Sequence, residues 1–292
     1  MAGTKVVAGS ASVGLGRELA KALSAEFVET LYEKHPGGFP DGERYVRVTG
    51  ALEGHDAVVV QTTHPDPKIV ELLLLLDAVR DLRPRSLALV IPYFGYGRQD
   101  KVFEPGEALS ARALAKHLQV GADRILLMGM HNPAVLGFFD VPATEVSGMP
   151  AVGRYLKDKD VDFVLAPDDG AVRHAKEVAE ASGKPWDALE KTRIDSYTVR
   201  VEPKRLDVAG RRVAIVDDVI STGGTVALAA RELKAQGAKH VLVAALHGLF
   251  VGNAWDKLSA CDEVATSDTV PSRATRFSVA PEFAAALRAR GV

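Results

Sequence analysis

The sequence predicts an α/β protein of two similar units, each a mostly parallel sheet flanked by helices. Three observations support this fold class. The chain has 292 residues, enough for two domains of ordinary size. Short apolar, β-branched runs alternate with segments of helical periodicity. The alternation also restarts after about Gly148, which divides the chain into residues 1–147 and 148–292.

The first unit is expected to contain four strands and two helices. Its continuous apolar runs favour strands that are buried on both faces, as in a parallel sheet. Segment 68–82 repeats apolar residues at helical spacing, which favours a helix. In chain order we expect strands over 6–8 and 57–62, a helix over 68–82, a strand over 86–91, a helix over 111–118 and a strand over 124–128.

The second unit repeats this alternation. We expect a short linker near Val146–Pro150. Strands are then expected over 162–166, 212–216 and 240–246, with helices over 171–181 and 226–236. A final helix over 281–290 can pack on either unit.

Composition excludes several classes of protein. Hydrophobic residues make up 47% and charged residues 25%, which is typical of a soluble globular protein. The net charge of −2 gives no basic field to attract nucleic acid. The longest apolar run, Leu72–Leu76, is far too short to span a membrane. Because there is no apolar leader and only one cysteine, Cys261, we expect a cytoplasmic protein without disulfides.

The most informative segment lies in the second unit. An apolar strand ends in two carboxylates, and a turn rich in glycine and hydroxyl groups follows before a helix begins. The residues concerned are Asp217, Asp218, Ser221, Thr222, Gly223, Gly224 and Thr225. Backbone N–H groups at such a turn and helix N-terminus can bind a phosphate, and glycine permits its close approach.

The two carboxylates refine this interpretation. They would repel a phosphate, but they are suited to binding the hydroxyl groups of a sugar whose phosphate lies in the turn. Open α/β sheets bind ligands at this edge, outside the carboxyl ends of the strands. The alternative is an ordinary strand–turn–helix in which Ser and Thr cap the helix.

Further motifs occur in the first unit and at the start of the second. They are FPDGER (39–44), PYFGYGRQD (92–100), Met130-His131-Asn132 followed by GFFD (137–140), and PDDG (167–170). Two common nucleotide motifs are absent. Gly14 and Gly16 begin like a dinucleotide-binding fingerprint but lack its third glycine. Gly9 and Gly14 have the spacing of a Walker phosphate-binding loop but are not followed by Gly-Lys-Ser/Thr.

In their order and spacing, these motifs closely resemble the ribose-phosphate pyrophosphokinase family over nearly the whole chain. The resemblance implies two phosphoribosyltransferase-like domains, ATP and ribose 5-phosphate as substrates, Mg²⁺ as cofactor, and a homo-oligomer. It also implies the site residues. ATP would be bound by Phe39, Asp41, Gly42, Glu43, Arg98 and Gln99, and ribose 5-phosphate by Asp217, Asp218 and Ser221 to Thr225. The metal would be held by His131 and Asp168.

The resemblance also identifies the catalytic residues as Lys191 and Arg193, on a basic loop. Pyrophosphoryl transfer needs charge stabilisation and in-line positioning more than covalent chemistry. Two cations on a closing loop can meet that need. Without the resemblance to the family, Lys191 and Arg193 would be interpreted as part of an ordinary solvent-exposed turn.

The sequence departs from the family pattern at Gly129, where many members have an acid, at Ala171, and in the short loop between Gln99 and Ser110. Allosteric behaviour is therefore left open. Two other functions also remain. A base phosphoribosyltransferase would explain the second unit alone, and a non-catalytic regulatory paralogue would fit the loss of the acid at Gly129.

Overall fold

The computed structural model describes residues 3–33, 39–130, 132–189, 192–193, 199–200 and 207–292. The chain divides into two compact units. One comprises residues 1–147 and 278–292, and the other residues 148–277. Among the described residues, no helix is long and apolar enough to cross a membrane.

The first unit is built on a six-stranded sheet in the order β2-β1-β5-β6-β7-β8, and every pairing is parallel. Its strands are β1 (Thr4–Ala8), β2 (Glu26–Val28), β5 (Asp56–Val60), β6 (Ser86–Ile91), β7 (Arg124–Met128) and β8 (Ala143–Val146). Its helices are α1 (Val13–Leu23), α2 (Pro67–Asp81), α3 (Ser110–Leu118), a 3₁₀ helix (Pro133–Phe138) and α8 (Ala280–Arg288).

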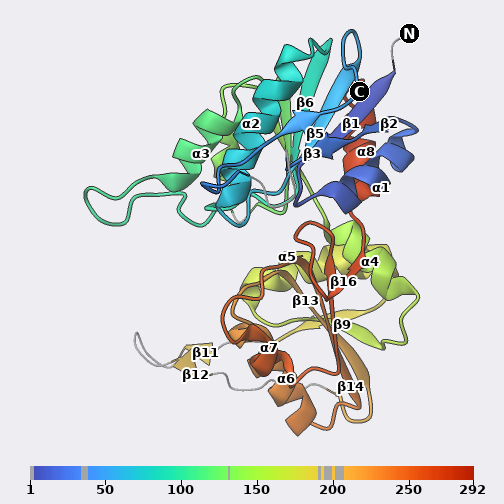
Figure 1. The fold of residues 1–292 in the computed structure, drawn as a ribbon. Coiled ribbons are helices and arrows are strands. Elements are labelled where there is room, and N and C mark those ends of the chain that lie inside the picture. Colours follow the sequence, from blue (N-terminus) through green and yellow to red (C-terminus); the bar gives the residue numbers. More distant parts are fainter. Residues whose placement is uncertain (1–2, 34–38, 131, 190–191, 194–198, 201–206) are drawn as a thin grey trace. The chain divides into compact units, whose positions relative to one another are not determined.

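Helices cover both faces of this sheet (Figure 1). Successive side chains of a strand point to opposite faces, so the continuous apolar strands supply two cores. Val7, Val59 and Leu89 belong to one core, together with buried residues of α2 and α3. The last helix, α8, packs against α1 and buries Phe283 and Leu287. It therefore belongs to the first unit, although it follows the second along the chain.

The second unit repeats the arrangement, with six parallel strands in the order β10-β9-β13-β14-β15-β16. These are β9 (Phe163–Ala166), β10 (Trp186–Ala188), β13 (Arg212–Ile220), β14 (His240–Gly248), β15 (Glu263–Ser267) and β16 (Thr275–Phe277). The helices are α4 (Met149–Lys157), a 3₁₀ helix (Asp169–Ala171), α5 (Val172–Ser182), α6 (Gly224–Ala235) and α7 (Ala254–Leu258).

Each sheet has the same connectivity, because its strands, numbered by their order in the chain, stand in the order 2-1-3-4-5-6. Each unit also has a two-stranded antiparallel hairpin between its second and third sheet strands. In the first unit it pairs β3 (Thr30–Leu31) with β4 (Arg47–Val48). In the second it pairs β11 (Thr192–Arg193) with β12 (Val199–Arg200).

Three sequence expectations need correction. The strand expected over 212–216 continues to Ile220, so Asp217 and Asp218 lie within it. The linker near Val146–Pro150 is shorter than expected, because β8 runs to Val146 and α4 already begins at Met149. Proline is tolerated in the first turn of a helix, where its missing N–H has no partner to lose. Several elements were not expected at all, among them helices α1, α4 and α7 and strands β2, β8, β10, β15 and β16.

Candidate active site

The phosphate-type turn joins the third sheet strand of the second unit to a helix. β13 ends at Ile220 and α6 begins at Gly224. Gly223 has a φ of 72°, in the left-handed region, and an added Cβ would lie 3.3 Å from Leu258 Cγ. The positive φ favours glycine, and a Cβ at this position would be tightly packed against Leu258. Helix α6 begins at this turn. Because N–H groups in the first turn of a helix have no partner within the helix, the oxygens of a phosphate can accept hydrogen bonds from them.

Three carboxylates gather at the same edge of the sheet. Asp217 and Asp218 lie near the carboxyl end of β13, and Asp168 follows the end of the adjacent strand β9. Parallel neighbours end at one edge, which explains the grouping of residues about 50 apart in sequence. The Asp218 N–H donates to Asp217 Oδ1 at 2.9 Å, and the Gly170 N–H donates to Asp168 Oδ1 at 3.1 Å.

The grouping changes the acidity of one carboxyl. Burial and the neighbouring Asp218 carboxylate raise the pKa of Asp217 from 3.8 to about 8, and Asp168 adds to the effect. Like charges in a poorly solvated position disfavour ionisation of one another. Hydroxyl donors or a cation at this position would stabilise the ionised form.

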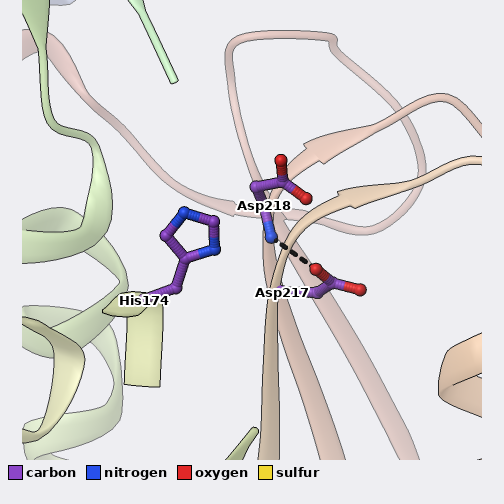
Figure 2. Close-up of side chains that lie close together, drawn as sticks. All are labelled: His174, Asp217 and Asp218. Atoms are coloured by element: carbon purple, nitrogen blue, oxygen red, sulfur yellow. Dashed lines mark hydrogen bonds between the residues drawn. The ribbon is translucent and has the colours of Figure 1, made fainter. Parts of the chain in front are cut away.

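A histidine that the sequence analysis did not assign lies beside this pair. His174 is in the first turn of α5, and its imidazole lies near the part of β13 that carries the two carboxylates (Figure 2). The ligand atoms of His174, Asp217 and Asp218 all lie within 4.8 Å of one another. A sequence signal existed, because His174 comes one helical turn after the PDDG segment. That signal becomes specific only once α5 is placed against β13.

The predicted catalytic loop is only partly described. Arg193 ends β11, which pairs with β12, while Lys191 lies outside the described residues. The structure therefore attaches the loop to a hairpin of the second unit. The roles of Lys191 and Arg193 stay predictions.

In the first unit, the FPDGER segment forms the turn between β3 and β4. Gly42, at a φ of 80°, donates its N–H to Phe39 O at 2.9 Å, and the Glu43 N–H donates to Asp41 Oδ1 at 3.0 Å. Asp41, Gly42 and Glu43 are exposed, whereas Phe39 is half-buried and packs edge-on against Tyr45. Phe39, Gly42 and Glu43 line a cleft of about 620 Å³. The cleft is also lined by Ser10 after β1, by Tyr32 after β3, and by Lys68 and Glu71 of α2.

The other predicted ATP residues lie elsewhere in this unit. Arg98 and Gln99 are in the loop after β6, and neither lines the cleft described above. Arg98 is exposed. The Gln99 side chain donates to Lys101 O at 3.3 Å and to Glu107 Oε2 at 3.4 Å. The assignment of Arg98 and Gln99 to the ATP site stays a prediction.

The predicted metal ligand His131 lies outside the described residues, but its neighbours are described. Asn132 Nδ2 donates to Asp100 Oδ2 at 2.5 Å, which ties this loop to the one after β6. The Met130 N–H donates to Glu145 Oε1 at 3.0 Å. A carboxylate from β8 thus stands beside the segment in which Gly129 replaces the expected acid.

Two parallel α/β units, one carrying a phosphate turn after its third sheet strand, define a protein of the phosphoribosyltransferase type. Family comparisons agree in both halves. Residues 4–121 match the N-terminal domain of ribose phosphate pyrophosphokinase, and residues 151–280 match the phosphoribosyl transferase domain. The chain belongs to the ribose-phosphate pyrophosphokinase family, which confirms the predicted family and fold class.

Individual relatives support this assignment over the full length. The ribose-phosphate pyrophosphokinase of Methanopyrus kandleri is 41% identical over 97% of this chain and 98% of its own. That of Thermococcus kodakarensis is 46% identical over 84% of this chain and 88% of its own. The crystal structure of phosphoribosylpyrophosphate synthetase from Mycobacterium smegmatis superposes with a TM-score of 0.78 at 33% identity, covering 99% of this chain and 98% of that one.

Proposed function

We propose that this enzyme transfers the β,γ-pyrophosphoryl group of ATP to the anomeric hydroxyl of ribose 5-phosphate. The products are 5-phosphoribosyl 1-pyrophosphate and AMP. The observation that carries the proposal is the full-length similarity to ribose-phosphate pyrophosphokinases, together with the sugar-phosphate geometry at the end of β13.

Ribose 5-phosphate is assigned to the second unit. The turn from Ser221 to Thr225 would bind its phosphate through backbone N–H groups at the start of α6. Asp217 and Asp218 would accept hydrogen bonds from the ribose hydroxyls. A substrate must therefore present a dianionic group and neighbouring hydroxyls at a fixed separation.

ATP is assigned to residues of the first unit. Phe39 would stack on the base, and Asp41 and Glu43 would accept hydrogen bonds from the ribose of ATP. Arg98 and Gln99 would contact the phosphates or the base. The exposure of Asp41, Gly42 and Glu43 is consistent with a role in contacting a ligand or a neighbouring subunit.

Mg²⁺ fits the donor set at the sheet edge, because carboxylate oxygens are the ligands that this hard cation prefers. Asp168 is proposed as a metal-associated carboxylate near the pyrophosphate, and His131 as a ligand of the Mg²⁺ carried by the ATP phosphates. When bound, it would offset the negative charge of the ATP phosphates.

In the reaction, the anomeric oxygen attacks the β-phosphorus of ATP, and the bond from that phosphorus to the oxygen bridging to the α-phosphorus breaks. AMP leaves with that oxygen. Lys191 and Arg193 would stabilise the charge that develops on the transferring group. The anomeric proton passes to solvent or to a group that we do not assign.

One assay tests the proposal. The protein is incubated with ATP, Mg²⁺ and ribose 5-phosphate, and the nucleotides are separated by chromatography. We expect AMP and phosphoribosyl pyrophosphate in equal amounts, and no AMP when ribose 5-phosphate is omitted. Formation of ADP would contradict the proposal. An absence of AMP, with binding of both substrates intact, would favour the regulatory paralogue.

Assembly and location complete the proposal. A homo-oligomer is expected in which the Phe39–Glu43 turn of one chain completes the ATP site of another. A cytoplasmic location is consistent with the single cysteine, which cannot form an intrachain disulfide.

A further inference from the structure

We propose that His174, Asp217 and Asp218 form a site for one divalent cation in the second unit, with the His174 imidazole as a nitrogen ligand. The site is separate from the proposed His131 ligand of the first unit. The ion would bind without any nucleotide. This inference deepens the proposed function of the ribose subsite, but its test requires no turnover.

The geometry carries the proposal. Each residue offers one ligand atom, and these atoms all lie within 4.8 Å of one another (Figure 2). An octahedral ion with bonds of about 2.1 Å separates its ligand atoms by roughly 3–4 Å. The three ligand atoms are therefore only slightly more widely spaced than the ligands of a bound ion.

The charges also favour a cation. Asp217 and Asp218 are sequence neighbours, both are only partly exposed, and Asp168 adds a third negative charge within electrostatic range. Within the described part of the chain, no lysine or arginine forms an ion pair with Asp217 or Asp218. Arg173 Nη2 lies 3.4 Å from His174 Nε2, but its guanidinium also pairs with Glu177. Hydroxyl groups of a sugar can donate hydrogen bonds to the two carboxylates but cannot neutralise them. A divalent ion does so directly.

The scaffold holds the ligands in place before an ion binds. β13 is an interior strand, paired with β9 on one side and β14 on the other. Helix α5, which carries His174, packs against both β9 and β13. Ligands on rigid elements keep their positions better than ligands on loops. The three donors therefore need little ordering on binding.

The imidazole determines which ions are preferred. Mg²⁺ favours oxygen ligands and keeps several waters, whereas Mn²⁺ and later first-row ions accept imidazole nitrogen readily. We therefore expect this site to bind Mn²⁺ at least tenfold more tightly than Mg²⁺. The preference should decrease when only the carboxylates remain.

The test is Mn²⁺ binding to the substrate-free protein, followed by electron paramagnetic resonance. Titration counts the bound ions, and pulsed measurements detect coupling between Mn²⁺ and an imidazole ¹⁴N nucleus. We expect one tightly bound Mn²⁺ per chain with ¹⁴N coupling. In His174→Gln we expect the coupling to disappear and the affinity to fall at least tenfold. In Asp218→Asn the affinity should fall while the coupling is retained.

Two further histidine variants serve as controls. His240 begins β14 at the opposite, amino end of the strands, so His240→Gln should bind Mn²⁺ normally. His131→Gln should also keep the ¹⁴N coupling. If the coupling survives in His174→Gln but disappears in His131→Gln, the ion belongs to His131 and the proposal is wrong. It is also wrong if the wild-type protein shows no coupled Mn²⁺.

Failure of this inference is distinguishable from failure of the proposed function. No ATP or ribose 5-phosphate is present in the Mn²⁺ titration, and formation of AMP is measured separately. Circular dichroism of each variant shows whether it is folded. A wild-type ¹⁴N signal could come from either His174 or His131. If His174→Gln does not fold, His131→Gln therefore decides between them: retained coupling supports His174, and lost coupling contradicts the proposal.

Discussion

The Asp217 carboxyl group and its neighbours restrict what the proposed ribose subsite would accept. Asp218 is adjacent in sequence, and Asp168 is close enough to help raise the pKa of Asp217. A phosphate placed against these carboxylates would be repelled, whereas sugar hydroxyls can donate to them. The N-terminus of α6, a few residues further along the chain, has the opposite preference. Together these groups favour a sugar that carries its phosphate at a distance from its hydroxyls.

We predict that Asp217→Asn weakens ribose 5-phosphate binding by about 10- to 100-fold, the value of one hydrogen bond to a charged group. ATP binding should change much less, because ATP is assigned to the first unit. Calorimetric titration with each substrate measures both affinities. The matched control is Asp41→Asn, which should weaken ATP selectively. Equal losses of both substrates in Asp217→Asn would contradict the assignment.

A second residue-scale prediction concerns stability. Asp56, at the start of β5, is buried and accepts hydrogen bonds from Arg85 Nε at 2.9 Å, from a second Arg85 nitrogen, and from Ser86 Oγ at 2.7 Å. The Arg85 guanidinium and these hydrogen bonds lower the pKa of Asp56. The stabilisation is therefore present above the unfolded-state pKa and is lost as the pH falls through the lower folded-state pKa.

Asp56→Asn should accordingly reduce the free energy of unfolding at pH 7 by about 1–3 kcal/mol. Arg85 is half-exposed, which favours the lower end of this range. The difference from wild type should shrink at acidic pH. Urea unfolding followed by circular dichroism at pH 7 and at pH 3 measures both values. Glu29→Gln, which removes an exposed ion pair with Arg17, should cost less. A loss independent of pH would show that charge is not involved.

His174 shows what the sequence could not supply at this scale. The motif residues Asp168, Asp217 and the turn after β13 were identifiable because their spacing resembles a known family. His174 is one of eight histidines and belongs to none of the quoted motifs. Its proposed role as a ligand depends on the packing of α5 against β13, which helical periodicity alone does not predict.

At the scale of elements, the sequence identified the buried strands well and the polar ends of elements poorly. Strands over 86–91 and 124–128 were predicted with their observed bounds, because apolar runs define them. β13 extends four residues further than predicted, since Asp217 and Asp218 ended the apolar run. Tertiary pairing with β14 outweighs their low strand propensity. β15 and β16 contain polar residues and were missed for the same reason.

The hairpin of β11 and β12 gives a prediction at this scale. We expect Lys191→Ala to reduce kcat by at least about 10²-fold, the usual effect of removing one group that stabilises transition-state charge. Ribose 5-phosphate binding should remain, so kcat and kcat/KM should fall together. Steady-state kinetics and calorimetry measure the two effects. Lys176→Ala, on an exposed position of α5, is the matched control. Near-normal turnover in Lys191→Ala would remove this residue from the catalytic assignment.

The whole molecule uses one topology twice, with different chemistry at equivalent places. Both sheets have the same strand order, and both hairpins follow the second sheet strand. The hairpins carry different predicted residues: the Phe39–Glu43 turn lies between β3 and β4, whereas Arg193 lies in β11, the first strand of the second hairpin. The sequence indicates two α/β units but not this shared hairpin, because the two segments have no motif in common.

The units differ most where the second carries its phosphate turn. In the first unit, the buried Glu71 carboxylate accepts hydrogen bonds from the backbone and hydroxyl of Ser10 at 2.7 and 2.8 Å, from Gln61 at 2.9 Å, and from Lys68 at 3.2 Å. These donors near the ends of β1 and β5 are thus already engaged by Glu71, and the carboxylate would repel a phosphate placed beside it.

The last prediction concerns assembly of the complete site. Asp41 and Glu43 are exposed on the turn between β3 and β4, and we propose that this turn completes the ATP site of a neighbouring chain. The double variant Asp41→Ala/Glu43→Ala and the variant Lys191→Ala should each be nearly inactive. After subunit exchange, confirmed by mass spectrometry of differently tagged chains, their mixture should regain activity, because some interfaces then combine one intact turn with one intact catalytic loop. The control is a mixture of two differently tagged Lys191→Ala preparations, which should stay inactive. A fully active monomer in light scattering, or no recovery after confirmed exchange, would mean that one chain builds the whole site.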